Sequence, residues 1–109
     1  MEESIMGKKR DIKELVTLIS LALTHKIGSL VNPNEIYSEK YRKESDSFLK
    51  KAIKISLKQN WNKDDKAKIK ELLKKKLKDD LKKRDFIDDK KFSLIDDEIN
   101  NVLSLIGLN

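Results

Sequence analysis

The feature that most constrains this chain is an apolar pattern with the period of an α-helix, which recurs in four segments. In the first segment, isoleucine, leucine and valine return three and four residues apart from Ile12 to Leu30. An α-helix turns once in about 3.6 residues, so this spacing places those side chains on one face. The 109 residues include only three glycines and one proline, which is too few turn formers for many short strands. The sequence therefore predicts an all-α fold.

Four helices are expected, and short connections between them favour antiparallel neighbours in a single-domain bundle. Their expected bounds are roughly residues 10–31, 33–59, 63–84 and 90–106. Residues 1–9 lack the apolar period and are expected to form a flexible tail, which leaves 10–109 as one helical domain. Asn62 is a candidate cap for the third helix, and Gly107 is a candidate end for the fourth.

Two of these helices leave alternatives open. The first carries Leu18, Leu21 and Ala22 beside its apolar face, so little of its surface is polar. Such a helix must be covered on nearly all sides, either at the centre of the bundle or at an oligomer interface. The second has a polar middle around Ser45, which either breaks the helix or lies within an unbroken one; the unbroken form is favoured.

The absence of cysteine excludes disulfides, thiolate catalysis and cysteine-ligated zinc. The N-terminal residues lack the basic and then apolar order of a signal peptide. The longest charge-free run, residues 15–25, is too short to span a membrane. We therefore expect no membrane insertion and a cytoplasmic location.

The net charge of +6 is unevenly distributed along the chain. Residues 50–84 contain fifteen basic and five acidic side chains, a net charge of +10. The last segment, residues 93–109, has three acids and no base. The molecule is therefore basic in its middle and acidic at its end, and a basic stripe is a candidate surface for nucleic acid or another polyanion.

Within the basic segment, five lysines spaced four residues apart are expected to form one continuous ridge on the third helix. These ridge lysines are Lys66, Lys70, Lys74, Lys78 and Lys82. Their row is roughly 24 Å long, and like charges at this spacing cost a helix a few tenths of a kcal/mol per pair. Helix stability does not select such a row, whereas a track for phosphates would explain it through counterion release. The alternative is an ordinary solvated face, because residues 63–84 hold ten lysines among 22 positions, with acids nearby.

Aromatic side chains near these lysines strengthen the nucleic-acid interpretation if they are exposed. Trp61 lies in the connection before the ridge, where it either stacks on unpaired bases or plugs the end of the bundle. Tyr37 and Tyr41 share a helix face with Phe48, which favours burial of both tyrosines. The candidate binding residues are therefore the five ridge lysines and Trp61.

No arrangement in the sequence carries a recognisable catalytic, cofactor or metal chemistry. There is no phosphate-binding glycine loop, nucleophile motif or metal-ligand cluster, and the one histidine, His25, has no partner at a catalytic spacing. Doubled acids such as Asp64 and Asp65 suit helix starts and ion pairs better than a divalent metal. We therefore expect a non-enzymatic protein without cofactor, metal or small-molecule substrate.

Two functions follow from these features. The first is binding of nucleic acid or another polyanion through the basic surface of residues 50–84. The alternative is a protein–protein adaptor or accessory subunit, which binds another protein or self-associates through the first helix as a homo-oligomer. In size and helical architecture, the expected fold is similar to small helical immunity proteins of the bacteriocin type.

Overall fold

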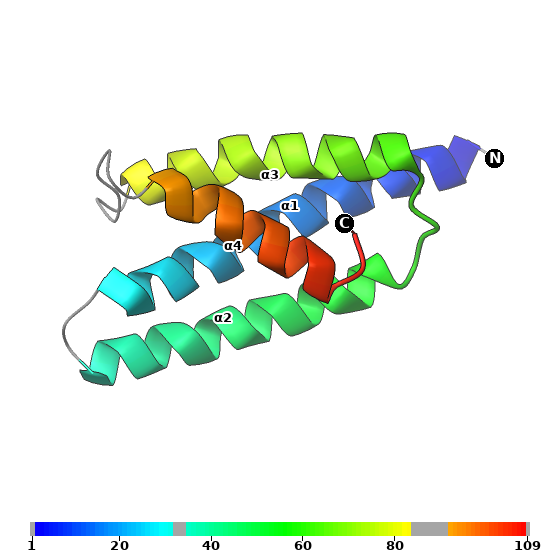
Figure 1. The fold of residues 1–109 in the computed structure, drawn as a ribbon. Coiled ribbons are helices and arrows are strands. Elements are labelled where there is room, and N and C mark those ends of the chain that lie inside the picture. The colour runs from blue at the N-terminus through cyan, green and yellow to red at the C-terminus, as the bar shows by residue number, and fades with distance from the viewer. Residues whose placement is uncertain (1, 32–34, 84–91, 109) are drawn as a thin grey trace.

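A computed structural model describes residues 2–31, 35–83 and 92–108 of the chain. These residues form four α-helices and no strand, which confirms the predicted all-α fold (Figure 1). The helices are α1 (Glu2–Val31), α2 (Glu35–Ser56), α3 (Lys63–Lys83) and α4 (Phe92–Leu105). Each coincides with one of the four periodic segments; the expected start of the second helix at residue 33 lies outside the described residues.

The largest difference from the predicted bounds is at the N-terminus. α1 begins at Glu2 rather than at residue 10, so residues 2–9, expected to be a flexible tail, are helical. Their support comes from a distant part of the chain. The Lys8 ammonium lies 2.6 Å from a carboxylate oxygen of Asp65 and 5.9 Å from the ring centre of Trp61. Apolar spacing along the sequence does not reveal such contacts, which explains why the predicted helix started too late.

α2 is unbroken through its polar middle, the form that the sequence favours. The buried Ser45 hydroxyl donates a hydrogen bond of 2.6 Å to the carbonyl oxygen of Ala22 in α1, so this polar group has an acceptor inside the fold. α2 ends at Ser56 rather than at residue 59. The reason is that the indole N–H of Trp61 donates to the Ser56 carbonyl at 2.8 Å and so occupies an acceptor that a longer helix would use.

The predicted caps of α3 and α4 are present. Asn62 Oδ1 accepts a hydrogen bond of 2.8 Å from the amide of Asp65, and Asp65 Oδ2 accepts one of 3.1 Å from the amide of Asn62. This reciprocal pair forms a capping box at the start of α3. After α4, Gly107 adopts a φ of +76°, and the amide of Leu108 donates to the Leu103 carbonyl at 2.8 Å, as in a Schellman motif.

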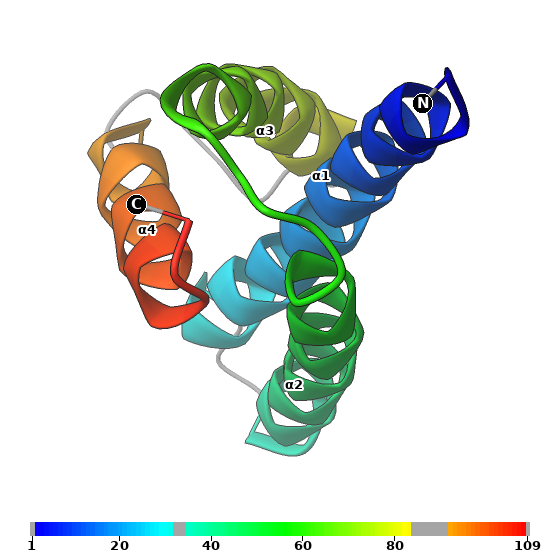
Figure 2. The ribbon, with the colours of Figure 1, turned by 90° about the vertical axis from the view of Figure 1, so that its right-hand side faces the viewer.

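Successive helices run in opposite directions along the chain (Figure 1). α1 lies at the centre and contacts all three other helices, which matches the first of the two alternatives for this apolar helix. Within the described part of the chain, the backbone of α2 approaches only that of α1, so the helices do not form a closed square (Figure 2). α1 and α3 consequently run in the same general direction, and they pack against each other at an angle.

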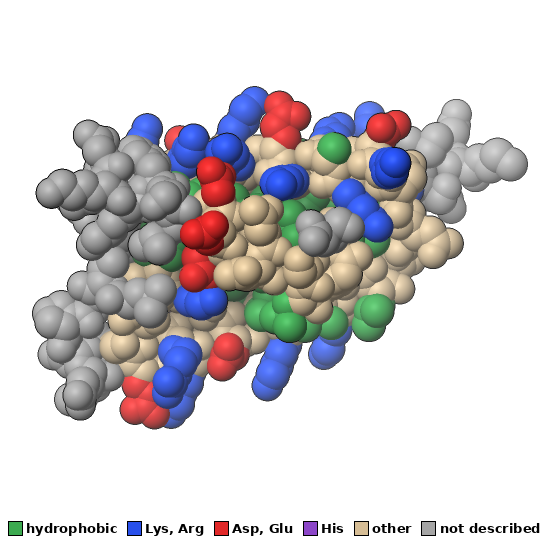
Figure 3. Space-filling model, in the orientation of Figure 1, with side chains coloured by type: hydrophobic (Ala, Val, Ile, Leu, Met, Phe, Trp, Pro, Cys, Tyr) green, Lys and Arg blue, Asp and Glu red, His purple; other side chains and the backbone are tan. Residues whose placement is uncertain are grey.

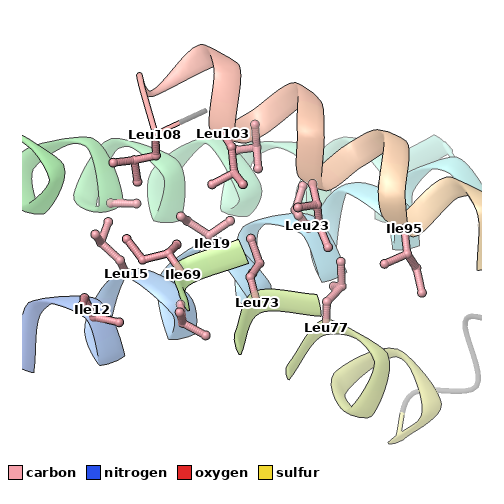
Figure 4. Packing of buried hydrophobic residues seen from close by; sticks show 14 of the residues in the cluster. Ile12, Leu15, Ile19, Leu23, Ile69, Leu73, Leu77, Ile95, Leu103 and Leu108 are labelled. Atoms are coloured by element: carbon pink, nitrogen blue, oxygen red, sulfur yellow. The ribbon is translucent and has the colours of Figure 1, made fainter. Parts of the chain in front are cut away.

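One hydrophobic core joins the four helices (Figure 4). Leu15 and Ile19 of α1 and Leu73 of α3 are completely covered, each with 0% of its surface exposed. α4 adds Ile95, which is 0% exposed, and Leu103, which is 1% exposed. Burying one such side chain stabilises a fold by roughly 1.5–3 kcal/mol relative to leaving it in water. The apolar residues that recur along the sequence therefore form the core through which α1 packs against α3.

Candidate polyanion-binding surface

The five ridge lysines lie along α3, and α4 neutralises part of their row. Lys70, Lys74 and Lys82 are exposed, whereas Lys66 and Lys78 are half-buried. The Lys74 ammonium lies 3.2 Å from a carboxylate oxygen of Asp96 in α4, and Lys78 is also engaged in an interaction. Basic side chains nevertheless remain visible along the α3 edge of the molecule (Figure 3). The acidic end of the chain thus pairs with the basic middle inside one molecule.

Trp61 is anchored against the protein. Its ring is half-buried and packs on the hydrophobic core, while its indole N–H is hydrogen-bonded to Ser56 and the Lys8 ammonium lies over its ring. Tyr41 is half-buried in edge-to-face contact with the His25 ring at 5.7 Å, and the side chain of Tyr37 lies outside the described part. Stacking of Trp61 on a base therefore stays a prediction, and the ring already has a structural use.

A second basic surface lies between α1 and α3. We call it the α1–α3 groove; it is an open groove of about 680 Å³. Its lining residues are Lys9, Ile12, Lys13, Val16, Thr17, Lys68, Leu72, Lys75, Lys76 and Asp79. Five lysines from two helices thus surround one carboxylate. Neither α2 nor α4 contributes to this lining, and Figure 2 shows both helices on other sides of α1.

The packing of α1 against α3 places the lysines of the groove in two rows. Lys9 and Lys13 stand four residues apart on α1, and therefore on one face of that helix. Lys68, Lys75 and Lys76 are spread over roughly 12 Å of α3. Because α1 and α3 pack against each other and both line the groove, the rows form opposite walls of one groove rather than two separate patches.

Three of the groove lysines form no ion pair with the carboxylates that the structure describes. Among the described residues, Lys9, Lys13 and Lys68 are exposed and make no ion pair within 4 Å. The other two have weak partners within α3, because Lys75 lies 3.7 Å from Glu71 and Lys76 lies 3.6 Å from Asp80. Exposed ion pairs of this kind contribute little. The positive charge of the groove is therefore available to an anionic ligand.

Sequence reasoning missed the α1 wall of this groove. Lys9 fell in the expected tail, and Lys13 stood on the first helix, away from the segment of highest positive charge. Their spacing of four residues was a usable signal for a short basic row. The sequence offered no sign that this row lies beside Lys68, because that depends on which helices pack side by side.

Asp65 connects the start of α3 to α1. The hydrogen bond from the Lys8 ammonium holds the pKa of the Asp65 carboxyl below its ordinary value of 3.8, while burial acts in the opposite direction. The amide of Asn62 and the nearby charge of Lys68 lower the pKa further. A carboxyl with a depressed pKa stabilises the fold above its ordinary pKa, and this contribution is lost as the pH falls through the depressed value.

Replacing Lys8 by glutamine is expected to raise the pKa of the Asp65 carboxyl toward 3.8, because the strongest lowering contact is removed. The loss of stability in the Lys8→Gln variant should be present near neutral pH and vanish in acid, where Asp65 is protonated in either protein. An NMR titration of the side-chain carboxyl measures the shift. Lys9→Gln serves as the control, since Lys9 makes no ion pair among the described residues; equal pKa values in both variants would contradict the assignment.

Two titratable side chains of the described residues, Asp11 and His25, are buried, and both have structural partners. Asp11 Oδ2 accepts a hydrogen bond of 2.9 Å from Gln59 Nε2. His25 is 7% exposed; its Nδ1 lies 2.7 Å from the Leu21 carbonyl and its Nε2 lies 2.9 Å from a Glu44 carboxylate oxygen. The contact with Glu44 ties α1 to α2. Among the described residues, no group of three acidic, histidine or cysteine side chains converges to hold a metal ion. No helix within the described ranges combines the length and apolar character needed to cross a membrane.

A search of protein-family models, curated proteins and solved structures found no match to this chain. A functional proposal therefore rests on the geometry of the groove and on the charges around it.

Proposed function

We propose that this chain is a non-enzymatic binding protein for nucleic acid or another polyanion. The binding surface is the basic region of residues 50–84, extended by Lys9 and Lys13 of α1. The observation that carries the proposal is the α1–α3 groove, in which two packed helices present five lysines against one carboxylate. Neighbouring positive charges repel each other in the free protein, and a phosphate polymer that neutralises them gains free energy by releasing its own counterions.

The proposal predicts binding that weakens steeply with salt. If three to five lysines contact a duplex, the logarithm of the association constant should fall with the logarithm of the salt concentration with a slope of about −2.7 to −4.5. Fluorescence anisotropy of labelled mixed-sequence DNA, titrated with the protein at several salt concentrations, measures this slope. Undetectable binding of single strands, duplexes and inorganic polyphosphate at low salt would overturn the proposed function.

A second candidate function is a protein–protein adaptor, and a different surface favours it. An apolar cleft of about 540 Å³ lies between α1, α2 and α4, with Leu23, Leu49 and Val102 in its lining and Leu105 at 69% exposure. Hydrophobic side chains reach the surface between α4 and α2 (Figure 3). The apolar face of α1 is covered by its own chain, so this cleft is the better surface for a partner or a second copy. Sedimentation of the free protein separates a stable homodimer from a monomer.

A further inference from the structure

The lysine walls of the α1–α3 groove enclose an apolar floor. Ile12 and Val16 of α1 lie there, each 6% exposed, together with Leu72 of α3, which is 36% exposed. Leu72 stands four residues after Lys68 and four before Lys76, so it shares their face of the helix. We infer that this groove binds a single nucleic-acid strand in preference to a duplex, an inference that rests on the proposed function.

The width of the groove argues against a duplex. Helices that pack directly on each other lie about 8–10 Å apart, axis to axis. The major groove of B-DNA alone is about 12 Å wide, so a whole duplex is far wider than the space between α1 and α3. A duplex therefore reaches only the ends of the lysine side chains, whereas a single strand can lie between the walls and reach Leu72.

The apolar floor of the groove also favours a single strand over a duplex. An unpaired base exposes flat faces that are largely apolar, and these faces are already stacked inside a duplex. Leu72 and the methylene stems of the neighbouring lysines offer apolar contact beside charges that pair with phosphates. None of the described lining residues is aromatic, so we expect only a weak dependence on base sequence.

An acidic helix of another protein matches the charge of the groove but not its apolar area. Stable protein interfaces bury about 800 Å² on each partner around an apolar centre. Among the described lining residues, Leu72 is the only large hydrophobic side chain that is substantially exposed, because Ile12 and Val16 are nearly covered. The groove is thus mainly a charged channel, which favours a phosphate polymer over a protein helix.

The test compares a short mixed-sequence DNA strand, the duplex of that sequence and inorganic polyphosphate, with the wild-type chain and with Leu72→Gln. We expect the wild-type protein to bind the single strand several-fold more tightly than the duplex. Leu72→Gln should lose about three- to tenfold in single-strand affinity and keep its polyphosphate affinity, because only the apolar contact is removed. Leu57→Gln is the matched control, since Leu57 is 80% exposed and lies outside the groove.

The other possible outcomes distinguish failure of the inference from failure of the proposed function. Equal affinity for single strand and duplex overturns the inference and leaves the proposed function standing. Failure of all three polyanions to bind overturns both. Tighter binding of an acidic amphipathic peptide than of the single strand, with loss in Leu72→Gln, assigns the groove to a protein partner and overturns the inference. The comparison of strand and duplex uses the wild-type chain, so it holds even if the variant folds poorly.

Discussion

Reversing the three groove lysines that make no ion pair with a described residue is expected to lower the affinity for a nucleic-acid strand by on the order of 100-fold at low salt. The variant is the triple substitution Lys9→Glu, Lys13→Glu and Lys68→Glu. Each change takes away one positive charge from the lining of the groove and adds a negative charge that is expected to repel phosphates. The salt slope for a single strand should also become shallower by about 0.7 for each phosphate that is no longer neutralised by a lysine. Anisotropy titrations at several salt concentrations measure both quantities.

The matched control reverses three ridge lysines on the other side of α3, namely Lys66→Glu, Lys70→Glu and Lys74→Glu. Both triples change the net charge of the protein by the same amount, so a difference between them reports the position of the charges. We expect the ridge variant to lose much less affinity than the groove variant. Equal losses would show that binding follows the overall charge of the protein, and a larger loss in the ridge variant would move the site to that face.

Truncating Leu73 to alanine should destabilise the fold by about 2–5 kcal/mol, because it leaves a cavity in the core shared by α1, α3 and α4 (Figure 4). Leu73 is 0% exposed, so the space cannot be filled by water at low cost. Domains of this size are stable by only about 5–15 kcal/mol, which makes the change a large part of the total. Unfolding in urea, followed by circular dichroism, measures the loss.

Leu105→Ala provides the comparison for the core variant. Leu105 is 69% exposed, so its truncation should change the free energy of unfolding by less than about 0.5 kcal/mol. A large loss in this variant would instead indicate that the side chain is covered in solution, as in a self-associated form that uses the cleft between α2 and α4. Equal effects of the two truncations would contradict the assignment of the core.

Much of the fold was predictable because local rules determine it. The apolar period indicated four helices, and the capping chemistry of Asn62 and Gly107 marked a start and an end. The errors came from side-chain contacts that the apolar period does not report. Lys8 in the unexpected first part of α1 pairs with the distant Asp65, and the indole of Trp61 is hydrogen-bonded to Ser56, the last residue of α2. No short window of sequence contains both members of the first pair.

The candidate site was likewise only partly predictable from the sequence. The ridge lysines belong to one helix, so their spacing alone placed each of them beside the next one in the row. The groove joins Lys13 with Lys68, and that juxtaposition exists only because α1 and α3 pack side by side. The ion pair between Lys74 and Asp96 likewise depends on where α4 lies. The spacing of lysines shows which face of a helix is basic, but it does not show which other helix packs beside that face.

The shared groove has a thermodynamic consequence. Its walls come from separate helices, so the complete cluster of lysines exists only in the folded chain. A polyanion that prefers this cluster must shift the folding equilibrium, by about 2.7 kcal/mol when its free concentration is 100 times its Kd. Until then, the lysines repel one another across the contact between α1 and α3. In the proposed complex, the polyanion supplies negative charge between the two rows of lysines, and the melting temperature of the protein is expected to rise with its occupancy.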